Sequence, residues 1–231
     1  MEDRLEILSN VKAIQDALPA FCRDPEHPPR ILAVTKTQPV ERILPLREAG
    51  ILAVGENHAQ EILEKYPALA ADFEIHMIGR LQTNKIKYII NRVCLVQSLD
   101  SMHLAQALDA KAQAAGVRMP VLLQVNIGRE AQKGGLPPEE ALSFARECAK
   151  LPGLAVRGLM TVLPKADDPE TVRPLFRGMR ELFERLQAEA IAGVDCRELS
   201  MGMSHDWRVA AQEGATMIRI GTAIFGERKY H

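Results

Sequence analysis

The sequence predicts an α/β fold: a single (β/α)8 TIM-like barrel with an extra N-terminal helix. Short apolar runs alternate with segments of helical periodicity along the whole chain, which is the pattern of a parallel sheet. Eight such runs occur, and eight strand–helix units close naturally into a barrel. A chain of 231 residues is ordinary for this fold. An open, doubly wound sheet is the alternative.

The first elements follow from spacing and breakers. Leu5, Leu8, Val11, Ile14 and Leu18 recur at helical spacing, which predicts a helix over residues 3–18 that Pro19 should end. Residues 31–35 form an apolar run and predict the first strand. A helix over residues 40–49 should follow, because a proline at 39 suits its first turn and a glycine at 50 its C-terminal cap.

The strand–helix unit then repeats to the end of the chain. Apolar runs predict further strands at residues 51–55, 73–78, 93–97, 119–127, 155–160, 197–201 and 216–220. Helical patterns lie between them, at residues 56–66, 81–91, 101–115, 138–150, 169–192 and 206–212. No Pro-, Ser- or Gly-rich linker interrupts the series, so residues 1–231 are expected to form one domain.

Composition limits the classes of function. The chain is 47% hydrophobic and 26% charged with a formal net charge of -1, which gives no electrostatic basis for binding nucleic acid or an anionic membrane. The N-terminus lacks the apolar core of a signal peptide. The four cysteines lie far apart, and Cys94 and Cys148 fall within apolar or helical patterns. We therefore expect buried free thiols in a cytoplasmic protein with no nucleic-acid or membrane partner.

Lys36 is the first candidate for chemistry. It follows the first strand, and strand alternation places it on the same face as Leu32 and Val34. The carboxyl ends of barrel strands form the active-site rim. An amine against apolar walls loses hydration, which favours the neutral nucleophile that forms Schiff bases with aldehydes. The alternative is that Lys36 marks only the point where the strand meets water.

Polar and glycine residues gather at the predicted carboxyl ends of the other strands. They are Asn57, Gln82, Gln97, Ser98, Asn126, Thr161, Ser200, Ser204, Arg219 and Thr222, with Gly55, Gly79, Gly202 and Gly221. Each has a structural alternative: Asn57 could cap a helix, and Asn126 could stabilise a turn. Their joint position at one rim favours a site.

Two segments near the C-terminus suit phosphate. Ser204 is predicted near the start of a helix, where a hydroxyl lies beside free backbone N–H groups. Gly221 allows close approach of a phosphate to the backbone, and Thr222 adds a hydroxyl. No pair of histidines has metal-ligand spacing with a carboxylate, so no metal site is expected. An amine together with a phosphate cradle is what pyridoxal 5'-phosphate requires.

The chain closely resembles the pyridoxal phosphate homeostasis proteins, a family with the alanine-racemase-like (fold type III) barrel. The matching motifs are residues 33–37, 55–61, 76–85, 124–127 with 132–134, 200–206 and 219–226. Three positions depart from the family pattern. Ile75 stands where Trp is typical, His58 where Tyr is typical, and Trp207 where Phe is common.

The resemblance implies a role for each candidate residue. Lys36 would carry pyridoxal 5'-phosphate as an internal aldimine, Asn57 and Met160 would line the ring pocket, Ser204, Gly221 and Thr222 would hold the phosphate, and Arg219 would face the pyridine nitrogen. A guanidinium there opposes protonation of the ring, which limits carbanion chemistry. Trp207 lies three residues after Ser204, so we expect its indole near the cofactor.

The family's function is vitamin B6 homeostasis without established catalytic turnover. The expected partners are the cofactor itself, amino acids and apoenzymes that use it, and the expected state is a monomer or weak dimer. A cofactor-dependent amino-acid racemase is the alternative. Racemases that the chain resembles add a second domain that supplies a tyrosine base, whereas this chain ends just past its last strand. Tyr230 could still fold back to the rim.

Overall fold

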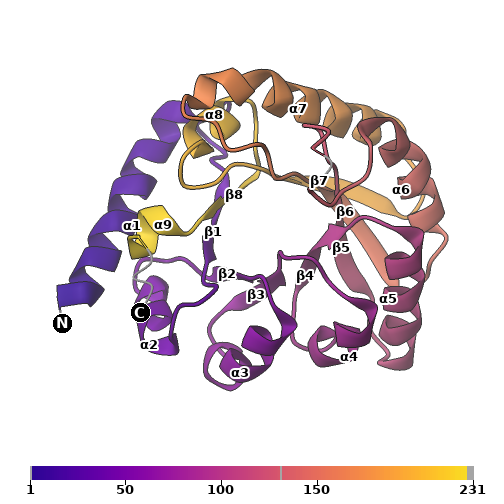
Figure 1. Ribbon diagram of the computed structural model, residues 1–231, viewed down its shortest axis with the longest axis horizontal. Coiled ribbons are helices and arrows are strands. Elements are labelled where there is room, and N and C mark those ends of the chain that lie inside the picture. The colour runs from indigo at the N-terminus through magenta and orange to yellow at the C-terminus, as the bar shows by residue number, and fades with distance from the viewer. Residues whose placement is uncertain (1, 131, 228–231) are drawn as a thin grey trace.

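Eight parallel strands pair in sequence order, and the last pairs with the first to close a barrel (Figure 1). The computed structural model describes residues 2–130 and 132–227. The strands are β1 Arg30–Val34, β2 Ala53–Glu56, β3 Glu74–Met77, β4 Leu95–Leu99, β5 Met119–Gln124, β6 Leu154–Met160, β7 Val194–Ser200 and β8 Met217–Ile220. Because β8 pairs with β1, with Arg219 opposite Leu32, the predicted barrel is confirmed and the open sheet is excluded.

Helices cover the outside of the barrel (Figure 1). The α-helices are α1 Glu2–Phe21, α2 Val40–Ile43, α3 Ala59–Leu69, α4 Ile86–Ile89, α5 Met102–Ala114, α6 Ala141–Ala149, α7 Arg173–Ala188, α8 Trp207–Gln212 and α9 Thr222–Phe225. Short 3-10 helices are η1 Leu44–Arg47, η2 Thr83–Lys85, η3 Pro138–Glu140 and η4 Pro169–Val172. The expected N-terminal helix, α1, packs against α8 and α9, beside the last strand.

Strand alternation divides the core into two layers. The inner layer fills the barrel with Leu32, Ala53, Leu95, Leu122, Met160 and Met217. Ile31 and Ala33, the neighbours of Leu32, point outward into the layer between strands and helices, where Phe176 and Phe183 of α7 also lie. Full burial of one such large apolar side chain contributes roughly 1.5–3 kcal/mol, so both layers stabilise the closed barrel.

Helix α1 differs from its prediction. It runs through Pro19 to Phe21, although Pro19 lacks the N–H that a helix interior needs. Phe21 packs edge-to-face on Trp207, with ring centroids 5.8 Å apart, and lies under the guanidinium of Arg208. These tertiary contacts hold the last residues of the helix after the breaker.

Other differences concern element lengths and one cysteine. The helices expected at residues 40–49 and 81–91 are each split into a single α-helical turn and a 3-10 segment. All four cysteines are free, and Cys148 is buried as expected. Cys94 is exposed, against the prediction, because it precedes β4 at the amino end of the barrel rather than lying within the strand.

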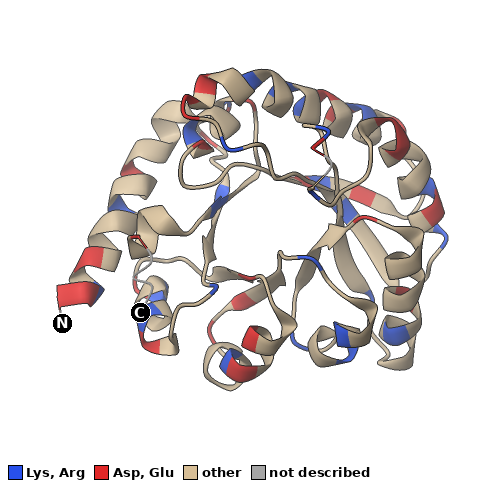
Figure 2. Ribbon diagram, in the orientation of Figure 1, with Lys and Arg blue, Asp and Glu red and all other residues tan. Residues whose placement is uncertain are grey.

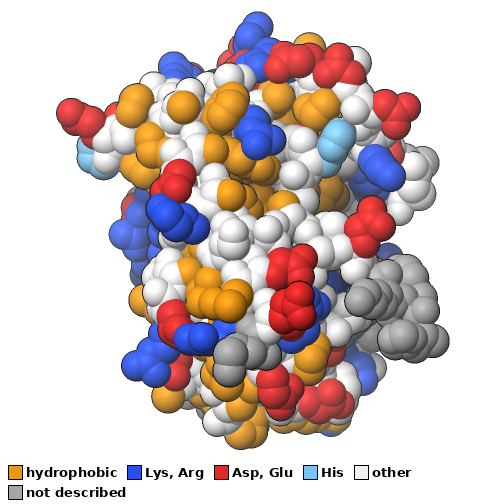
Figure 3. Space-filling model, turned by 90° about the vertical axis from the view of Figure 1, so that its left-hand side faces the viewer, with side chains coloured by type: hydrophobic (Ala, Val, Ile, Leu, Met, Phe, Trp, Pro, Cys, Tyr) orange, Lys and Arg blue, Asp and Glu red, His pale blue; other side chains and the backbone are white. Residues whose placement is uncertain are grey.

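Charges lie mainly on the outer helices, where both signs are mixed (Figure 2). On the face that Figure 3 shows, acidic and basic side chains are interspersed with hydrophobic ones. This mixture agrees with the net charge of -1. In the described part of the chain, no helix has the length and apolar character needed to cross a membrane.

Candidate functional site

A cavity of about 380 Å³ opens at the carboxyl ends of the strands. Six predicted site residues line it: Lys36, Asn57, Ser204, Arg219, Gly221 and Thr222. Its volume lies within the range of small-molecule sites, and it combines apolar walls with a few polar groups. Another hollow, of about 460 Å³, lies at the amino ends of the strands between α1 and β1–β3, and contains none of the predicted residues.

Met160 is the predicted residue that does not line this cavity. It is 1% exposed and packs in the inner layer of the barrel with Leu32 and Met217. Val162, two residues further along, lines the cavity instead. Because side chains two apart share a face, Met160 lies one layer deeper than the wall that it was expected to form.

Lys36 reaches the cavity because of strand alternation and the turn that follows. Leu32 lies in the inner layer, Val34 borders that layer and the cavity, and Lys36 lines the cavity. The chain then turns through Thr37, which has a positive φ of 64°, and Gln38 N donates to the carbonyl of Thr35. The lysine is thus the last inward-facing residue on the path of β1.

Ser204 joins the loops that follow β7 and β8. Its Oγ accepts hydrogen bonds from Gly221 N at 3.1 Å and Ala223 N at 3.2 Å. Gly202 makes the turn toward α8 possible: it has a φ of 89°, and a Cβ there would lie 2.5 Å from Ala210 Cβ. The Ser204 hydroxyl is thus fixed beside Thr222 by two backbone N–H groups and keeps its own hydrogen, so the two hydroxyls can donate to an anion.

Arg219 supplies a buried cation at the same cavity. Its side chain comes from β8, is 4% exposed as a residue, and donates from Nη1 to Ser200 Oγ at 2.7 Å and from Nη2 to Thr161 O at 2.6 Å. Burial lowers the pKa of Arg219 to about 10, although nearby Asp206 opposes the shift. The guanidinium therefore remains charged at neutral pH.

A chain of polar side chains continues from Arg219 down the inside of the barrel. Ser200 Oγ donates to Gln97 Oε1 at 2.7 Å, and Gln97 Nε2 lies 3.0 Å from His76 Nδ1. Burial lowers the pKa of His76 below its ordinary value, with Glu74 opposing. Ser200 and Gln97 were expected at the rim, but both are fully buried. The signal in the sequence for Gln97 was strand alternation, because it shares a face with Leu95, which lies in the inner layer of the barrel.

Asn57 takes its position from a close backbone contact. A Cβ at Gly79 would lie 2.3 Å from Asn57 O, so only glycine lets the loop after β3 pack here. Helix α3 is preceded by His58, not Asn57, and that N-cap makes no side-chain hydrogen bond. Asn57 therefore does not cap α3.

Asn126, Trp207 and Tyr230 were also considered for the site from the sequence, and none of them is among the described residues that line the cavity. Asn126 accepts from Glu130 N at 3.1 Å and donates to Glu130 O at 2.9 Å, so it stabilises a turn. Trp207 is 2% exposed, packs on Phe21 and does not line the cavity, against the expectation for its indole. Tyr230 lies outside the described residues.

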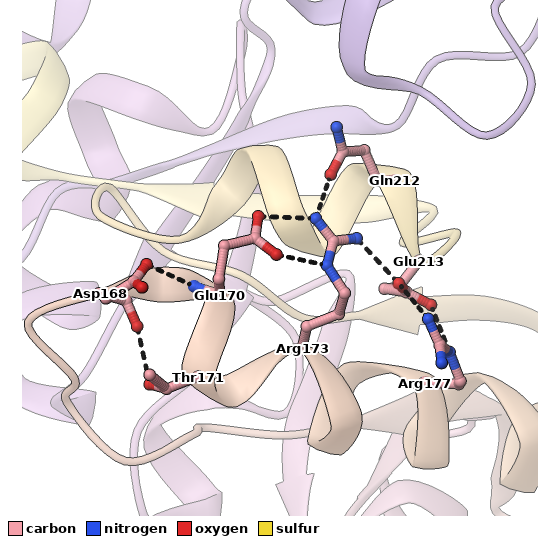
Figure 4. Close-up of polar contacts among 7 residues, drawn as sticks. All are labelled: Asp168, Glu170, Thr171, Arg173, Arg177, Gln212 and Glu213. Atoms are coloured by element: carbon pink, nitrogen blue, oxygen red, sulfur yellow. Dashed lines mark hydrogen bonds and ion pairs between the residues drawn. The ribbon is translucent and has the colours of Figure 1, made fainter.

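An ion-pair network joins two segments that border the cavity (Figure 4). Arg173, at the start of α7, binds Glu170 in η4 and reaches Gln212 at 2.6 Å and Glu213 at 2.8 Å at the end of α8. The loop before η4 carries Lys165, and the loop before α8 carries Ser204. The network therefore fixes the two loops relative to each other.

The arrangement can hold an anionic aldehyde. It offers the primary amine of Lys36, the hydroxyl donors of Ser204 and Thr222 for an anion, and the fixed cation of Arg219 in one cavity. Within residues 2–130 and 132–227, no group of three or more His, Cys, Asp or Glu side chains could hold a metal ion.

Comparisons with known proteins agree on one family. Residues 4–229 match the model described as alanine racemase, N-terminal domain. Proteins named pyridoxal phosphate homeostasis protein include one from Aquifex aeolicus, 47% identical over 202 residues (87% of this chain and 88% of the relative). Another, from Homo sapiens, is 36% identical over 230 residues (94% of this chain and 83% of the relative).

Solved structures show the same fold. PipY of Synechococcus elongatus, with PLP bound, superposes with a TM-score of 0.83 and 31% identity, covering 95% of this chain and 100% of that one. An alanine racemase of Clostridium difficile superposes with a TM-score of 0.73 at 18% identity, covering 96% of this chain and 58% of that one.

Proposed function

The chain belongs to the pyridoxal phosphate homeostasis protein family, and on this basis we propose that it binds pyridoxal 5'-phosphate and maintains the cellular supply of vitamin B6. The observation that carries the proposal is the single cavity shared by Lys36, Ser204, Gly221, Thr222 and Arg219. The proposal treats residues 1–231 as one cofactor-binding barrel domain that performs no catalytic turnover of its own.

The residues present fit this cofactor. A phosphate needs fixed donors, and the N–H groups of Gly221 and Ala223 already converge on the Ser204 hydroxyl. Thr222 adds a second hydroxyl to the same wall. The chemistry that the cofactor supplies when bound is the reversible condensation of an aldehyde with a primary amine, with release of one water. Lys36 is the amine that would hold it, and Asn57 would contact the ring.

Arg219 favours retention of the cofactor over catalytic turnover. It would face the pyridine nitrogen with a guanidinium that hydrogen bonds to Ser200 and to the carbonyl of Thr161 hold in place. This fixed positive charge opposes protonation of the ring nitrogen, so the ring remains a weak electron sink. The same feature disfavours the racemase alternative.

The proposal extends to partners and location. Amino acids could compete with Lys36 for the aldehyde, and apoenzymes that need the cofactor are its proposed recipients. We propose a monomer or weak dimer. The four free thiols suit a reducing compartment, which supports the cytoplasm.

Absorbance tests the proposed function directly. The purified protein mixed with pyridoxal 5'-phosphate should develop a near-visible band different from that of the free cofactor, and borohydride should remove the band and leave one modified lysine. Peptide mapping by mass spectrometry should identify Lys36. A spectrum identical to that of free cofactor, with no covalent adduct after reduction, would contradict the proposed function.

A further inference from the structure

Three charged side chains form a cluster next to the turn that carries Lys36, with Glu56 and Lys65 buried and Glu61 partly buried. Lys65, on α3, is 9% exposed, and its Nζ donates to Glu56 Oε1 at 2.8 Å, Glu61 Oε2 at 2.8 Å and Thr35 O at 2.9 Å. An ammonium has three donors, so all of them are engaged. One side chain therefore joins β2, α3 and the end of β1.

The cluster binds the residues on both sides of Lys36. Before it, Thr35 offers its carbonyl to Lys65 and donates its hydroxyl to Glu56 Oε1 at 2.7 Å. After it, Thr37 N donates to Glu61 Oε2 at 2.7 Å. Both neighbours of Lys36 are thus held by carboxylates that Lys65 links together.

The conformation of Thr37 needs such support. Its φ of 64° lies in the left-handed region, which is unfavourable for a β-branched residue. Strained backbone persists where the surrounding contacts determine it. The hydrogen bond from Thr37 N to Glu61 is one such contact, and it sets the direction in which the chain leaves Lys36.

Stability alone does not explain the cluster. Burial raises the pKa of Glu56, against the effect of Lys65, because the charged form loses hydration. Glu56 Oε2 is buried without a hydrogen-bond partner among the described residues. Apolar side chains of similar volume commonly stabilise a protein as well as a buried ion pair does. None of the three charged residues lines the cavity, so an effect on the ligand must pass through a neighbouring residue that does. Lys36 is such a residue, and the cluster binds both of its neighbours, Thr35 and Thr37.

We propose that Glu56, Glu61 and Lys65 are positioning residues that hold the Lys36 amine in the direction required to capture the aldehyde. The proposal rests on the proposed function, because Lys36 is the group that is positioned. It assigns a role to three residues outside the cavity, and it concerns covalent capture rather than recognition of the ring and phosphate.

Two phosphate esters separate these effects. Pyridoxal 5'-phosphate can react with Lys36, whereas pyridoxine 5'-phosphate carries an alcohol in place of the aldehyde and can only bind. One variant of the full-length protein carries Glu61→Gln. A second combines Lys65→Met with Glu56→Gln, so that the fully buried Glu56 is not left as an unpaired carboxylate. Asp109→Asn is the matched control, because Asp109 Oδ1 accepts Gly153 N at 2.7 Å near the amino ends of the strands.

Both cluster variants should slow the appearance of the borohydride-reducible adduct at Lys36 by about 10- to 100-fold, the effect of a small misplacement of a reacting group. Their Kd for pyridoxine 5'-phosphate should stay within about twofold of wild type. In the protein without cofactor, the rate at which acetic anhydride acetylates Lys36 should also differ between the cluster variants and wild type. The rate for Lys150 should be the same in both. Asp109→Asn should match wild type in all three measurements.

If the cluster variants lose adduct formation with pyridoxal 5'-phosphate and binding of pyridoxine 5'-phosphate to the same degree, the cluster only maintains the fold. If the rate of adduct formation is unchanged, the cluster does not position Lys36. Either result would overturn the inference. Failure of the proposed function is distinguishable, since wild type itself would then bind neither ester.

Discussion

Arg219 Nη1 donates a hydrogen bond to Ser200 Oγ at 2.7 Å, so the cation beside the cavity is held by the neighbouring strand. The Ser200 hydroxyl in turn donates a hydrogen bond to Gln97 Oε1, so it accepts one hydrogen bond and donates another. The polar interior of the barrel is therefore a directed chain in which each group determines the orientation of the next.

Ser200→Ala should destabilise the protein by about 1–3 kcal/mol, because it leaves Arg219 and Gln97 each short of a buried partner. The free energy of unfolding from urea titration measures the effect. Ser143→Ala is the control: that exposed hydroxyl donates to Glu140 O in a helix outside the barrel, and its loss should change stability by less than about 0.5 kcal/mol. Equal effects would show that the Arg219 contact contributes nothing specific.

Lys36→Ala should abolish the near-visible band of the bound cofactor, since the reactive amine is gone. Lys165→Ala is the matched control, because Lys165 lines the same cavity. The band of the bound cofactor should persist in this variant. Absorbance and mass mapping after borohydride reduction report the outcome. An adduct that survives Lys36→Ala and is lost with Lys165→Ala would transfer the role to Lys165.

Ser204→Ala should weaken pyridoxal 5'-phosphate binding by about 1–3 kcal/mol, the range for a hydrogen bond to a charged group. Pyridoxal without the phosphate should bind poorly to wild type and respond little to the substitution. Equilibrium titration of both compounds gives the comparison. If both lose the same affinity, Ser204 does not contact the phosphate.

His76 should make stability depend on pH. Burial lowers its pKa in the folded state below the unfolded value, so its contribution is fully present above the unfolded pKa, about 6.5, and is lost as the pH falls through the folded pKa. His76→Gln should therefore flatten the change in unfolding free energy between about pH 7.5 and about pH 5. Urea titrations at both values test this, and an unchanged slope for the variant would assign the dependence to other groups.

Amino acids should not be racemised at an enzyme-like rate. In the proposed binding mode Arg219 faces the pyridine nitrogen and keeps the ring a weak electron sink. No tyrosine is among the described residues that line the cavity. Alanine incubated in deuterium oxide with the loaded protein should exchange its α-hydrogen far more slowly than about 1 s⁻¹. Exchange at that rate or faster would restore the racemase alternative.

Much of the site could be predicted because strand ends in a parallel barrel converge on one rim. Lys36 and Ser204 are 168 positions apart, yet each lies just beyond the end of a predicted strand, and both line the cavity. Met160 was placed one layer too high, because the sequence indicates the face of a residue but not its depth along the barrel axis. That depth depends on the register between strands.

The sequence by itself determined the order of strands and helices, the inward face of Lys36, and the glycine and hydroxyl residues that line the cavity and are proposed to hold the phosphate. These depend on local periodicity and backbone preference, which a few neighbouring residues decide. Only the tertiary structure decided that Ser200 and Gln97 hold Arg219, that α1 continues past Pro19, and that Lys65 joins Glu56 to Glu61 beside Lys36. Such contacts join residues far apart in the sequence, and they form only when closure and register of the barrel bring the side chains together.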